Sequence, residues 1–411
     1  MINLSTKLAS KGFTITFVQT EFIHHSISKA HHHHLLSADF DIFTEARKSG
    51  LDIRYTTISD GFPLDFDRHL NGDLFWETMF RDFPDRVDEV VARTMKDEEE
   101  SCFFIIADTL CSWPATIAKK YNMVNVSLWT APATVFSINY HLDLLKQNGH
   151  FPFTGDGENH INYIPGVQSI STRDLMSYIQ HPNIKPVLVQ ITLKGFDQEP
   201  LAESDCTGWL HSKPPGSVLY VSFGSFAQSN KQLTAELAHG LLSSEVHFVW
   251  IIRPDVVGEN GIDDILPIGF EDVIKDRGLI VPWCNQNRVL SSPAIGGFLT
   301  HCGWNSIMES IWHGVPMICY PFYVDQPTNR KLVVDDWKIG INLCEGERVT
   351  REEVASKINV VMNGEKSAEL KREIKKVSEK LHDSLGSGGS SERNFNRFVD
   401  DLKAKLCEKQ K

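Results

Sequence analysis

The segment Trp283–Gln326 reads WCNQNRVLSSPAIGGFLTHCGWNSIMESIWHGVPMICYPFYVDQ, a run of 44 residues that holds strand, turn and helix patterns in succession. The apolar residues 279–282 predict a strand that ends at Trp283, and residues 296–300 predict a second short strand. A turn that contains glycine then leads into the helical pattern 307–311. Strands that alternate with helices predict a parallel sheet with helices on both faces, and therefore the α/β class.

The turn after the second strand carries hydrogen-bond donors. His301, Asn305 and Ser306 stand where the predicted helix begins. Free backbone N–H groups at a helix start favour a phosphate group, and these side chains add donors at the same point. Trp283 follows the other strand at its carboxyl end, where ligands bind in open parallel sheets, and its flat ring can stack on a base. The segment therefore predicts a nucleotide site with a diphosphate cradle.

The length and the end residues of this segment match the signature box of the plant family 1 UDP-glycosyltransferases, which the chain resembles. Those enzymes move a sugar from a UDP donor to a small acceptor. The resemblance implies that Trp283 stacks on uracil and that the backbone at Cys284 pairs with the base. It also implies that Gln286 and Glu309 contact the ribose.

Further residues match the sugar and phosphate contacts of the family. The resemblance implies that Asp325 and Gln326 hold the sugar hydroxyls and that Trp304 lines the sugar pocket. The resemblance also implies that Trp304 together with Gln326 favours glucose as the sugar. Ser225, in a glycine turn after the apolar run 217–222, matches a phosphate-contacting position. With such donors at the diphosphate, we expect neither a metal nor another cofactor.

Each of these residues also has an ordinary structural interpretation. Ser306 with Glu309 fits the Ser-x-x-Glu pattern of a helix cap, and a tryptophan at a strand end is usually part of the core. The pair Asp325–Gln326 also fits a polar loop. Their joint occurrence at one fixed spacing favours the binding site.

Composition narrows the class of protein. The chain has 411 residues, 41% of them hydrophobic and 23% charged, which is typical of a folded protein with two domains. A formal net charge of −12 argues against a nucleic-acid or anionic-membrane partner. The sequence shows no apolar run of about 18 residues, so we expect no membrane span.

Cysteine and histidine patterns bear on location and metal binding. The eight cysteines form no CxxC pair and no secretory leader opens the sequence, so we expect reduced thiols in a cytoplasmic protein. The four histidines 31–34 lack neighbouring ligands at a recognisable spacing, and we expect a solvated loop there rather than a metal site.

Strand and helix patterns recur in both halves of the chain. The resemblance implies a GT-B fold, in which two doubly wound Rossmann-like domains face a cleft. We expect an acceptor-binding domain over 1–200, a UDP-sugar-binding domain over 201–393, and a helix over 394–411 that packs back on the first domain. Within the first domain, residues 103–107 predict a buried strand.

The first domain departs from the family pattern. Family members use a histidine between the first strand and the first helix, oriented by an aspartate that Asp108 matches. Because the predicted helix 3–10 matches the family's first helix, the first strand and the histidine would lie before Met1 and are absent from this chain. Expected motifs near Gln198 are also missing, so we expect an incomplete first domain with exposed strand edges. A helix cap is the alternative role for Asp108.

Two functions of different classes follow from these patterns. The first is transfer of a sugar, most simply glucose, from UDP to a hydroxyl of a small lipophilic acceptor with inversion at the anomeric carbon. The second is a catalytically inactive nucleotide-sugar-binding protein, or an incomplete gene product, that lacks the catalytic histidine. An oxidoreductase that uses a nicotinamide is excluded because no G-x-G-x-x-G motif opens a helix.

Overall fold

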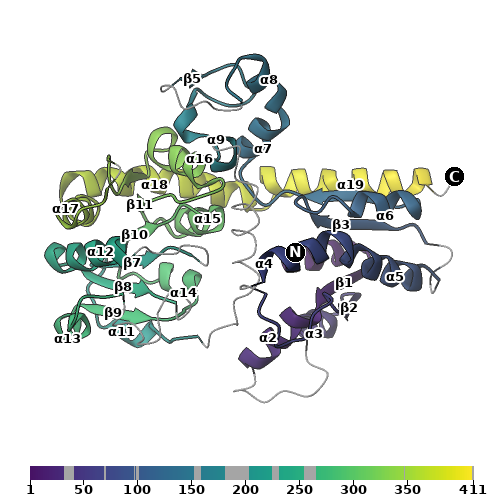
Figure 1. Ribbon diagram of the computed structural model, residues 1–411, viewed down its shortest axis with the longest axis horizontal. Helices are drawn as coiled ribbons and strands as arrows, with labels where there is room; N and C mark the ends of the chain where they lie inside the picture. The colour runs from purple at the N-terminus through teal and green to yellow at the C-terminus, as the bar shows by residue number, and fades with distance from the viewer. Residues whose placement is uncertain are drawn as a thin grey trace. The chain divides into compact units, whose positions relative to one another are not determined.

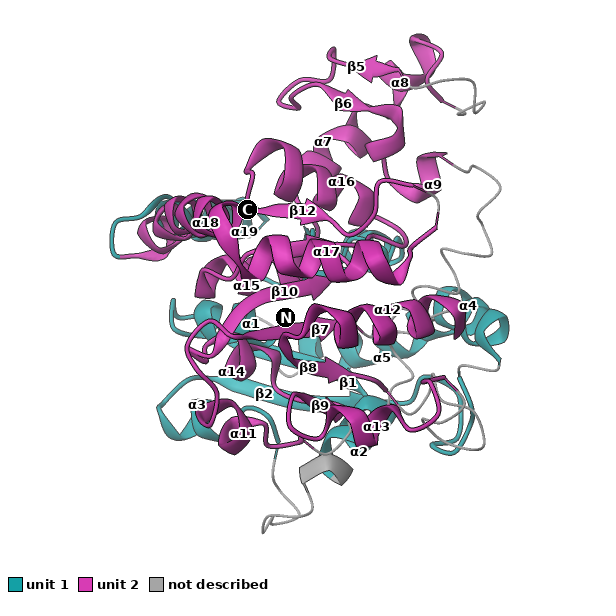
Figure 2. Ribbon diagram, turned by 90° about the vertical axis from the view of Figure 1, so that its left-hand side faces the viewer, with its two compact units in different colours: residues 1–130, 192–200, 387–411 teal, residues 131–191, 201–386 magenta. Residues whose placement is uncertain are grey.

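The computed structural model divides the chain into two compact α/β units (Figures 1 and 2). Unit 1 comprises residues 1–130, 192–200 and 387–411, and unit 2 comprises residues 131–191 and 201–386. The residues that the structure describes are 1–31, 41–68, 71–96, 98, 101–151, 159–180, 203–224, 231–253, 265–346 and 348–409.

Unit 2 is built on one parallel sheet of six strands in the order β12-β11-β10-β7-β8-β9. Counted along the chain, β7 is the first strand of this sheet and β12 is the sixth. From the β9 edge the strands therefore lie in the order 3-2-1-4-5-6, which is the order of a doubly wound nucleotide-binding fold. The first strand of this sheet, β7, therefore lies in its interior. The strands are β7 (Val218–Ser222), β8 (His247–Ile251), β9 (Gly278–Val281), β10 (Ile295–Thr300), β11 (Met317–Cys319) and β12 (Gly340–Asn342).

Helices cover both faces of this sheet. Leu219 and Trp250 belong to the hydrophobic cluster under α12 and α17, whereas Tyr220 and Phe298 belong to the cluster under α15 and α18. Alternate residues of a strand point to opposite faces, so interior strands are apolar throughout and β7 and β10 are buried along their whole length. The helices after β7 are α12 (Lys231–Ser244), α13 (Phe270–Ile274), α14 (Gln286–Leu290), α15 (Trp304–His313), α16 (Gln326–Lys331), the π-helix η4 (Leu332–Asp336), α17 (Arg351–Met362) and α18 (Gly364–Leu385), and α11 (Thr207–His211) precedes β7.

Residues 131–191, which come before the six-stranded sheet in the chain, also group with unit 2. We expected the domain boundary after residue 200. The Thr328 Oγ1 hydroxyl donates to the Asp174 carbonyl at 2.6 Å, and the Val324 N–H donates to Ser177 Oγ at 2.8 Å. These bonds attach the segment to α16 and to the loop before it. It contains α7 (Ala133–Tyr140), α8 (Leu142–Gln147), β5 (His160–Ile161), β6 (Ile170–Ser171), η1 (Thr172–Asp174) and α9 (Ser177–Gln180). The stretch around Gln198 lies outside the described residues.

The described residues of unit 1 form two separate parallel sheets of two strands each. One pairs β1 (Ile15–Thr20) with β2 (Ile53–Ile58), and the other pairs β3 (Phe104–Asp108) with β4 (Val124–Leu128). We expected β3 to be fully buried, but all five of its residues are partly exposed. One edge of β3 has no strand beside it among the described residues, which explains the exposure.

The last helix belongs to unit 1. Helix α19 (Ser390–Lys409) buries Val399 and Leu402 to 4% and 2% exposure, and Lys403 Nζ donates to the Lys11 carbonyl at 3.2 Å. The helix begins at Ser390, before the start that we predicted at residue 394, and it runs along unit 1 (Figure 1). The other helices of the unit are α1 (Ile2–Ala9), α2 (Glu21–His31), α3 (Thr44–Lys48), α4 (Gly72–Arg81), α5 (Phe83–Lys96) and α6 (Pro114–Lys120).

Candidate active site

A hydrogen-bonded network joins three elements of unit 2. Gln286, the first residue of α14, donates from Nε2 to Glu309 Oε2 at 2.6 Å and to Ser306 Oγ at 3.0 Å. Its Oε1 accepts from the buried Tyr220 hydroxyl on β7 at 3.4 Å. The network therefore fixes the Glu309 carboxylate on α15 and leaves its second oxygen as an acceptor. Carboxylate and amide groups held this way suit a pair of sugar hydroxyls.

Helix α15 begins at Trp304, so Ser306 is not its N-cap. Its N-cap is Gly303, and Ser306 lies inside the first turn, where its hydroxyl accepts from Gln286. The alternative interpretation of Ser306 and Glu309 as a capping box is therefore wrong. Because no side chain caps this ten-residue helix, its first N–H groups remain available to an anion. Asn305 is exposed in the same turn.

His301 lies directly after β10 and is 6% exposed. Burial lowers the pKa of the imidazole to about 4, against the opposing effect of a backbone contact with Ser222, so the ring is neutral at pH 7. Its Nδ1 is buried without a hydrogen-bond partner in the described structure. A Cβ on Gly224 would lie 2.5 Å from His301 Cε1, and one on Gly303 would lie 2.5 Å from Nε2. Two glycine turns therefore enclose the ring.

The loop after β11 is held against the same turn. Asn329 donates from Nδ2 to the Cys302 carbonyl at 3.0 Å and to Asp325 Oδ2 at 2.9 Å. Gln326 Oε1 accepts the backbone N–H groups of Phe322 and Tyr323 at 2.8 and 2.9 Å. Burial raises the pKa of Asp325, and the hydrogen bond from Asn329 opposes that rise. Asp325 and Gln326 thus occupy fixed positions next to the His301 turn.

Comparison with known proteins places this arrangement in a family. A family model described as UDP-glucoronosyl and UDP-glucosyl transferase matches residues 177–384. UDP-glycosyltransferase 86A1 of Arabidopsis thaliana is 46% identical over 459 aligned residues, covering 99% of this chain and 93% of that protein. The chain belongs to the plant UDP-glycosyltransferase family. Because the alignment is longer than the chain of 411 residues, the relative has positions without a counterpart here.

Two further comparisons agree with this membership. The 7-deoxyloganetin glucosyltransferase of Gardenia jasminoides is 31% identical, over 98% of this chain and 95% of that protein. The crystal structure of a UDP-glucose: anthocyanidin 3-O-glucosyltransferase in complex with UDP superposes with a TM-score of 0.79 at 24% identity, over 98% and 95% of the two chains. The predicted family, the GT-B fold and the glycosyltransferase class are confirmed. The chain is therefore related to enzymes that transfer a glycosyl group from a UDP-sugar to an acceptor.

Trp283 and Trp304, the two tryptophans of the segment 283–326 for which we predicted donor contacts, have different surroundings. Trp283 is partly exposed after β9, and its carbonyl accepts the Ser204 N–H at 3.1 Å. Trp304 packs on the core cluster of α15, with its ring 6.3 Å from that of Trp337 between centroids. Ser225 lies outside the described residues. Trp304 thus has a packing role besides the one that the sequence predicts.

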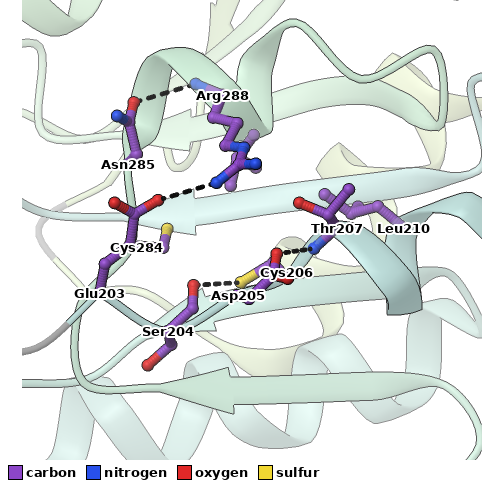
Figure 3. A pocket seen from close by; sticks show the side chains of 10 residues that line it. Glu203, Ser204, Asp205, Cys206, Thr207, Leu210, Cys284, Asn285 and Arg288 are labelled. Atoms are coloured by element: carbon purple, nitrogen blue, oxygen red, sulfur yellow. Dashed lines mark hydrogen bonds and ion pairs between the residues drawn. The ribbon is translucent and has the colours of Figure 1, made fainter. Parts of the chain in front are cut away.

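A small hollow lies beside Cys284 (Figure 3). Its volume of about 10 Å³ holds no more than a water molecule, so a nucleotide cannot bind in it. Cys206 and Cys284 line it with Arg288, which reaches Glu203 at 3.5 Å. Asn285 Oδ1 accepts the Arg288 N–H at 3.1 Å and so caps α14 (Figure 3). This cap fixes the helix start that carries Gln286.

Asp108 is the last residue of β3 in unit 1. Its Oδ1 accepts the Leu110 N–H at 2.9 Å, which closes a turn after the strand. The next helix, α6, has Trp113 as its N-cap and no side-chain cap, so the alternative role of Asp108 as a helix cap is wrong.

Other features bear on metals and membranes. The described residues contain no group of three or more His, Cys, Asp or Glu side chains that could hold a metal ion. His24, on α2, shares a hydrogen bond of 3.0 Å between Nδ1 and the Tyr55 hydroxyl, while residues 32–34 lie outside the described part. None of the helices within the described ranges is long and apolar enough to cross a membrane.

Sequence reasoning missed two residues of the site. Tyr220 points from β7 toward Gln286, and Asn329 joins the Cys302 turn to Asp325. Asn329 falls four residues after Asp325 on a helical stretch, and this i,i+4 spacing was the available signal. Tyr220 lies 66 residues before Gln286, so only the fold brings the two together.

Proposed function

We propose that unit 2 binds UDP-glucose and that the chain transfers the glucose to a hydroxyl of a small lipophilic acceptor. The uracil would stack on Trp283 and pair with the backbone at Cys284, and the ribose would bind Glu309 and Gln286. Asp325, Gln326 and Trp304 would contact the sugar, with Ser225 as a further phosphate contact. The acceptor class is supported by the glucosyltransferases among the relatives.

The observation that carries this proposal is the neutral, enclosed His301 in the turn between β10 and α15. A neutral imidazole can donate one N–H to a phosphate oxygen, and the uncapped N–H groups of α15 with Asn305 and Ser306 add further donors. These groups would stabilise the charge that develops on the leaving UDP. Fixed donors of this kind replace a cation, so no metal or other cofactor is part of the proposal.

The transfer itself would be a direct displacement. The acceptor oxygen forms a bond to the anomeric carbon while the bond from that carbon to the phosphate oxygen breaks, which inverts the configuration. The hydroxyl proton must pass to a base, and Asp108 would orient such a base rather than serve as one. We further propose a cytoplasmic location, since all eight cysteines are free thiols in the described structure.

A specific observation favours the second function, a nucleotide-sugar-binding protein without transferase activity. The Asp108 carboxylate accepts the Leu110 N–H, and the sheet that ends at Asp108 has two strands within the described residues. Among the described residues no histidine hydrogen-bonds to this carboxylate, and an enzyme that acts without a general base typically loses about 10²–10⁴ in rate.

Turnover separates the two functions. Purified chain is incubated with UDP-glucose and a set of phenolic and terpenoid alcohols, and glucoside and UDP are quantified against Asp108→Ala. Glucoside formed at least tenfold faster than by the variant supports the transferase. UDP-glucose binding without any glucoside supports the binding protein, and absence of both binding and product contradicts both functions.

A further inference from the structure

Helix α9 forms two hydrogen bonds to one residue of the loop that precedes α16, and both elements belong to unit 2. Ser177 donates its N–H to the Val324 carbonyl at 2.9 Å, and its Oγ accepts the Val324 N–H at 2.8 Å. Both backbone polar groups of Val324 are therefore held by one serine. Because Val324 directly precedes Asp325, these bonds fix the backbone at the point where the proposed sugar contacts begin.

Val324 has a left-handed backbone conformation, with a φ of 56°. Residues with a Cβ atom rarely adopt this conformation, and a β-branched residue is a genuine outlier there. Among the described residues, five residues other than glycine have a positive φ, and Val324 is the β-branched one of them. Such a conformation persists only where the surrounding structure holds it, and outliers of this kind cluster at ligand-binding sites.

A second residue of this group is connected with the same carboxylate. Cys302, in the turn before α15, has a φ of 65°. Asn329 donates from Nδ2 to the Cys302 carbonyl at 3.0 Å and to Asp325 Oδ2 at 2.9 Å. Asp325 is thus joined to one strained residue through Asn329 and to the other, Val324, through the main chain. Two strained residues at one carboxylate indicate that its position is important for binding.

The next residue of α9, Tyr178, lies beside Asp325 as well. Its hydroxyl accepts from Asn139 Nδ2 on α7 at 2.8 Å. Burial raises the pKa of Tyr178 to about 12, the hydrogen bond from Asn139 opposes that rise, and the negative charge of Asp325 adds to it. Helix α9 therefore approaches Asp325 through two successive residues, Ser177 and Tyr178.

Other contacts attach the same segment to α16 independently of Ser177. Thr328 Oγ1 donates to the Asp174 carbonyl at 2.6 Å, and Arg330 forms an ion pair with the Asp174 carboxylate. Loss of the Ser177 hydroxyl leaves these contacts in place. The bond from Val324 to this hydroxyl therefore acts on the conformation of the loop rather than on the attachment of the segment.

Gln326 depends on the same loop. Its Oε1 accepts the N–H groups of Phe322 and Tyr323 at 2.8 and 2.9 Å, across the turn that contains Val324. A change of φ at Val324 would redirect the chain between these two donors and Gln326. The side-chain amide would then leave its present position together with the Asp325 carboxylate.

We propose that Ser177 is a positioning residue for the donor sugar, because it holds Val324 in the left-handed conformation from which Asp325 and Gln326 reach the sugar hydroxyls. This inference rests on the proposed function of unit 2 as the UDP-glucose site. Without the acceptor on Ser177, Val324 relaxes toward a negative φ, and both sugar contacts lose their alignment.

Titrations with two ligands separate the sugar contacts from the rest of the site. UDP lacks the sugar and uses only the proposed contacts at the starts of α14 and α15. In calorimetry, Ser177→Ala should weaken UDP-glucose binding about tenfold or more and change UDP binding less than about twofold. Equal weakening of both ligands would show a general defect of unit 2 and overturn the proposal.

A matched control uses another serine of unit 2. The Ser212 hydroxyl donates to the Trp209 carbonyl at 2.7 Å at the end of α11. Ser212→Ala makes the same change of side chain away from the sugar contacts and should alter the binding of neither ligand. If it weakens UDP-glucose binding as much as Ser177→Ala does, the role assigned to Ser177 is wrong.

A second substitution tests whether the effect passes through Val324. Glycine adopts the left-handed conformation without steric cost. Adding Val324→Gly to Ser177→Ala should therefore restore UDP-glucose binding by about threefold or more relative to Ser177→Ala alone. A merely structural defect at Ser177 would not be repaired in this way. Failure of the glycine to restore binding overturns the proposal.

Ser177→Cys keeps the test valid if Ser177→Ala does not fold. The thiol has nearly the shape of the hydroxyl but is a weaker acceptor. We expect UDP-glucose binding to weaken about threefold or more, with UDP binding changed less than about twofold. An unchanged affinity for UDP-glucose in this variant overturns the proposal.

The unsubstituted chain distinguishes failure of this inference from failure of the proposed function. If it does not bind UDP-glucose, the proposed donor site is wrong and the role of Ser177 falls with it. If the unsubstituted chain and Ser177→Ala bind UDP-glucose equally well, the donor site stands and the role of Ser177 alone is wrong.

Discussion

Gln286 donates a hydrogen bond of 2.6 Å to Glu309 and so connects the first residue of α14 with the second turn of α15. The same amide accepts from the buried Tyr220 hydroxyl. One side chain thus aligns two helices of unit 2 and orients a carboxylate.

Gln286→Ala should weaken UDP binding about tenfold or more. The substitution frees the Glu309 carboxylate and removes the amide oxygen that accepts from the buried Tyr220 hydroxyl. A hydrogen bond to a charged group contributes about 1.5–3 kcal/mol. Calorimetric titration with UDP measures the change. The adjacent Asn287→Ala, on an exposed side chain that meets His313 at 3.2 Å, is the matched control. Equal affinities of the two variants would rule out an ordering role for Gln286.

Gly224→Ala should cost more stability than Gly314→Ala, although both glycines have nearly the same left-handed φ, 68° and 69°. Each alanine meets about 1–2 kcal/mol of backbone strain. At Gly224 the new methyl group also collides with the His301 ring at 2.5 Å, whereas nothing lies within 4 Å at Gly314. Overpacking adds about 1–3 kcal/mol. Urea unfolding measures both variants, and equal losses would show that the glycine does not enclose the ring.

His301 should make the stability of the chain depend on pH. Its folded-state pKa of about 4 lies below the usual value of 6.5, so the unfolded chain binds the extra proton between these two values. The free energy of unfolding therefore falls as pH falls through this window, by about 2 kcal/mol between pH 7 and pH 5. Urea unfolding of His301→Gln should lack this part of the pH dependence. An identical slope in the variant would mean that His301 is not buried as a neutral ring.

Arg68→Leu should destabilise unit 1 by about 3–5 kcal/mol, because it leaves the Asp60 carboxylate buried without its partner. The two side chains are 1% and 3% exposed and bond at 2.7 Å, and the guanidinium lies 3.8 Å from the Phe22 ring centroid. Arg81→Leu removes ion pairs with Glu77 and Asp82, but its arginine side chain is 60% exposed, so the loss of stability should be far smaller than at Arg68. Thermal and urea unfolding compare the two. A loss at Arg68 as small as at Arg81 would contradict the buried pair.

How much of the site was predictable depended on distance along the chain. Ser306 and Glu309 lie within one strand–turn–helix unit, so the sequence pattern alone located them together, and Gln286 lies in the same segment. Tyr220 and Asn329 join the site through the sheet and through a loop contact, for which the sequence offers little signal.

The fold of unit 1 shows the same limit. Residues 103–107 have the pattern of a buried strand, yet burial depends on neighbouring strands, and within the described part of unit 1 β3 pairs with β4 alone and is partly exposed. Residues 131–191 group with unit 2 through contacts such as those of Asp174 with Thr328 and of Ser177 with Val324. These partners lie about 150 positions apart in the chain. Local patterns indicate the elements but not these long-range contacts.

The most direct test of the central claim is calorimetric titration of the full chain with UDP-glucose. Glu309→Ala should lose binding at least tenfold, while Glu365→Ala, on the exposed start of α18, should bind as the unsubstituted chain does. UDP-glucose binding that Glu309→Ala leaves unchanged, or no binding by the unsubstituted chain, would contradict the assignment of unit 2 as the donor site.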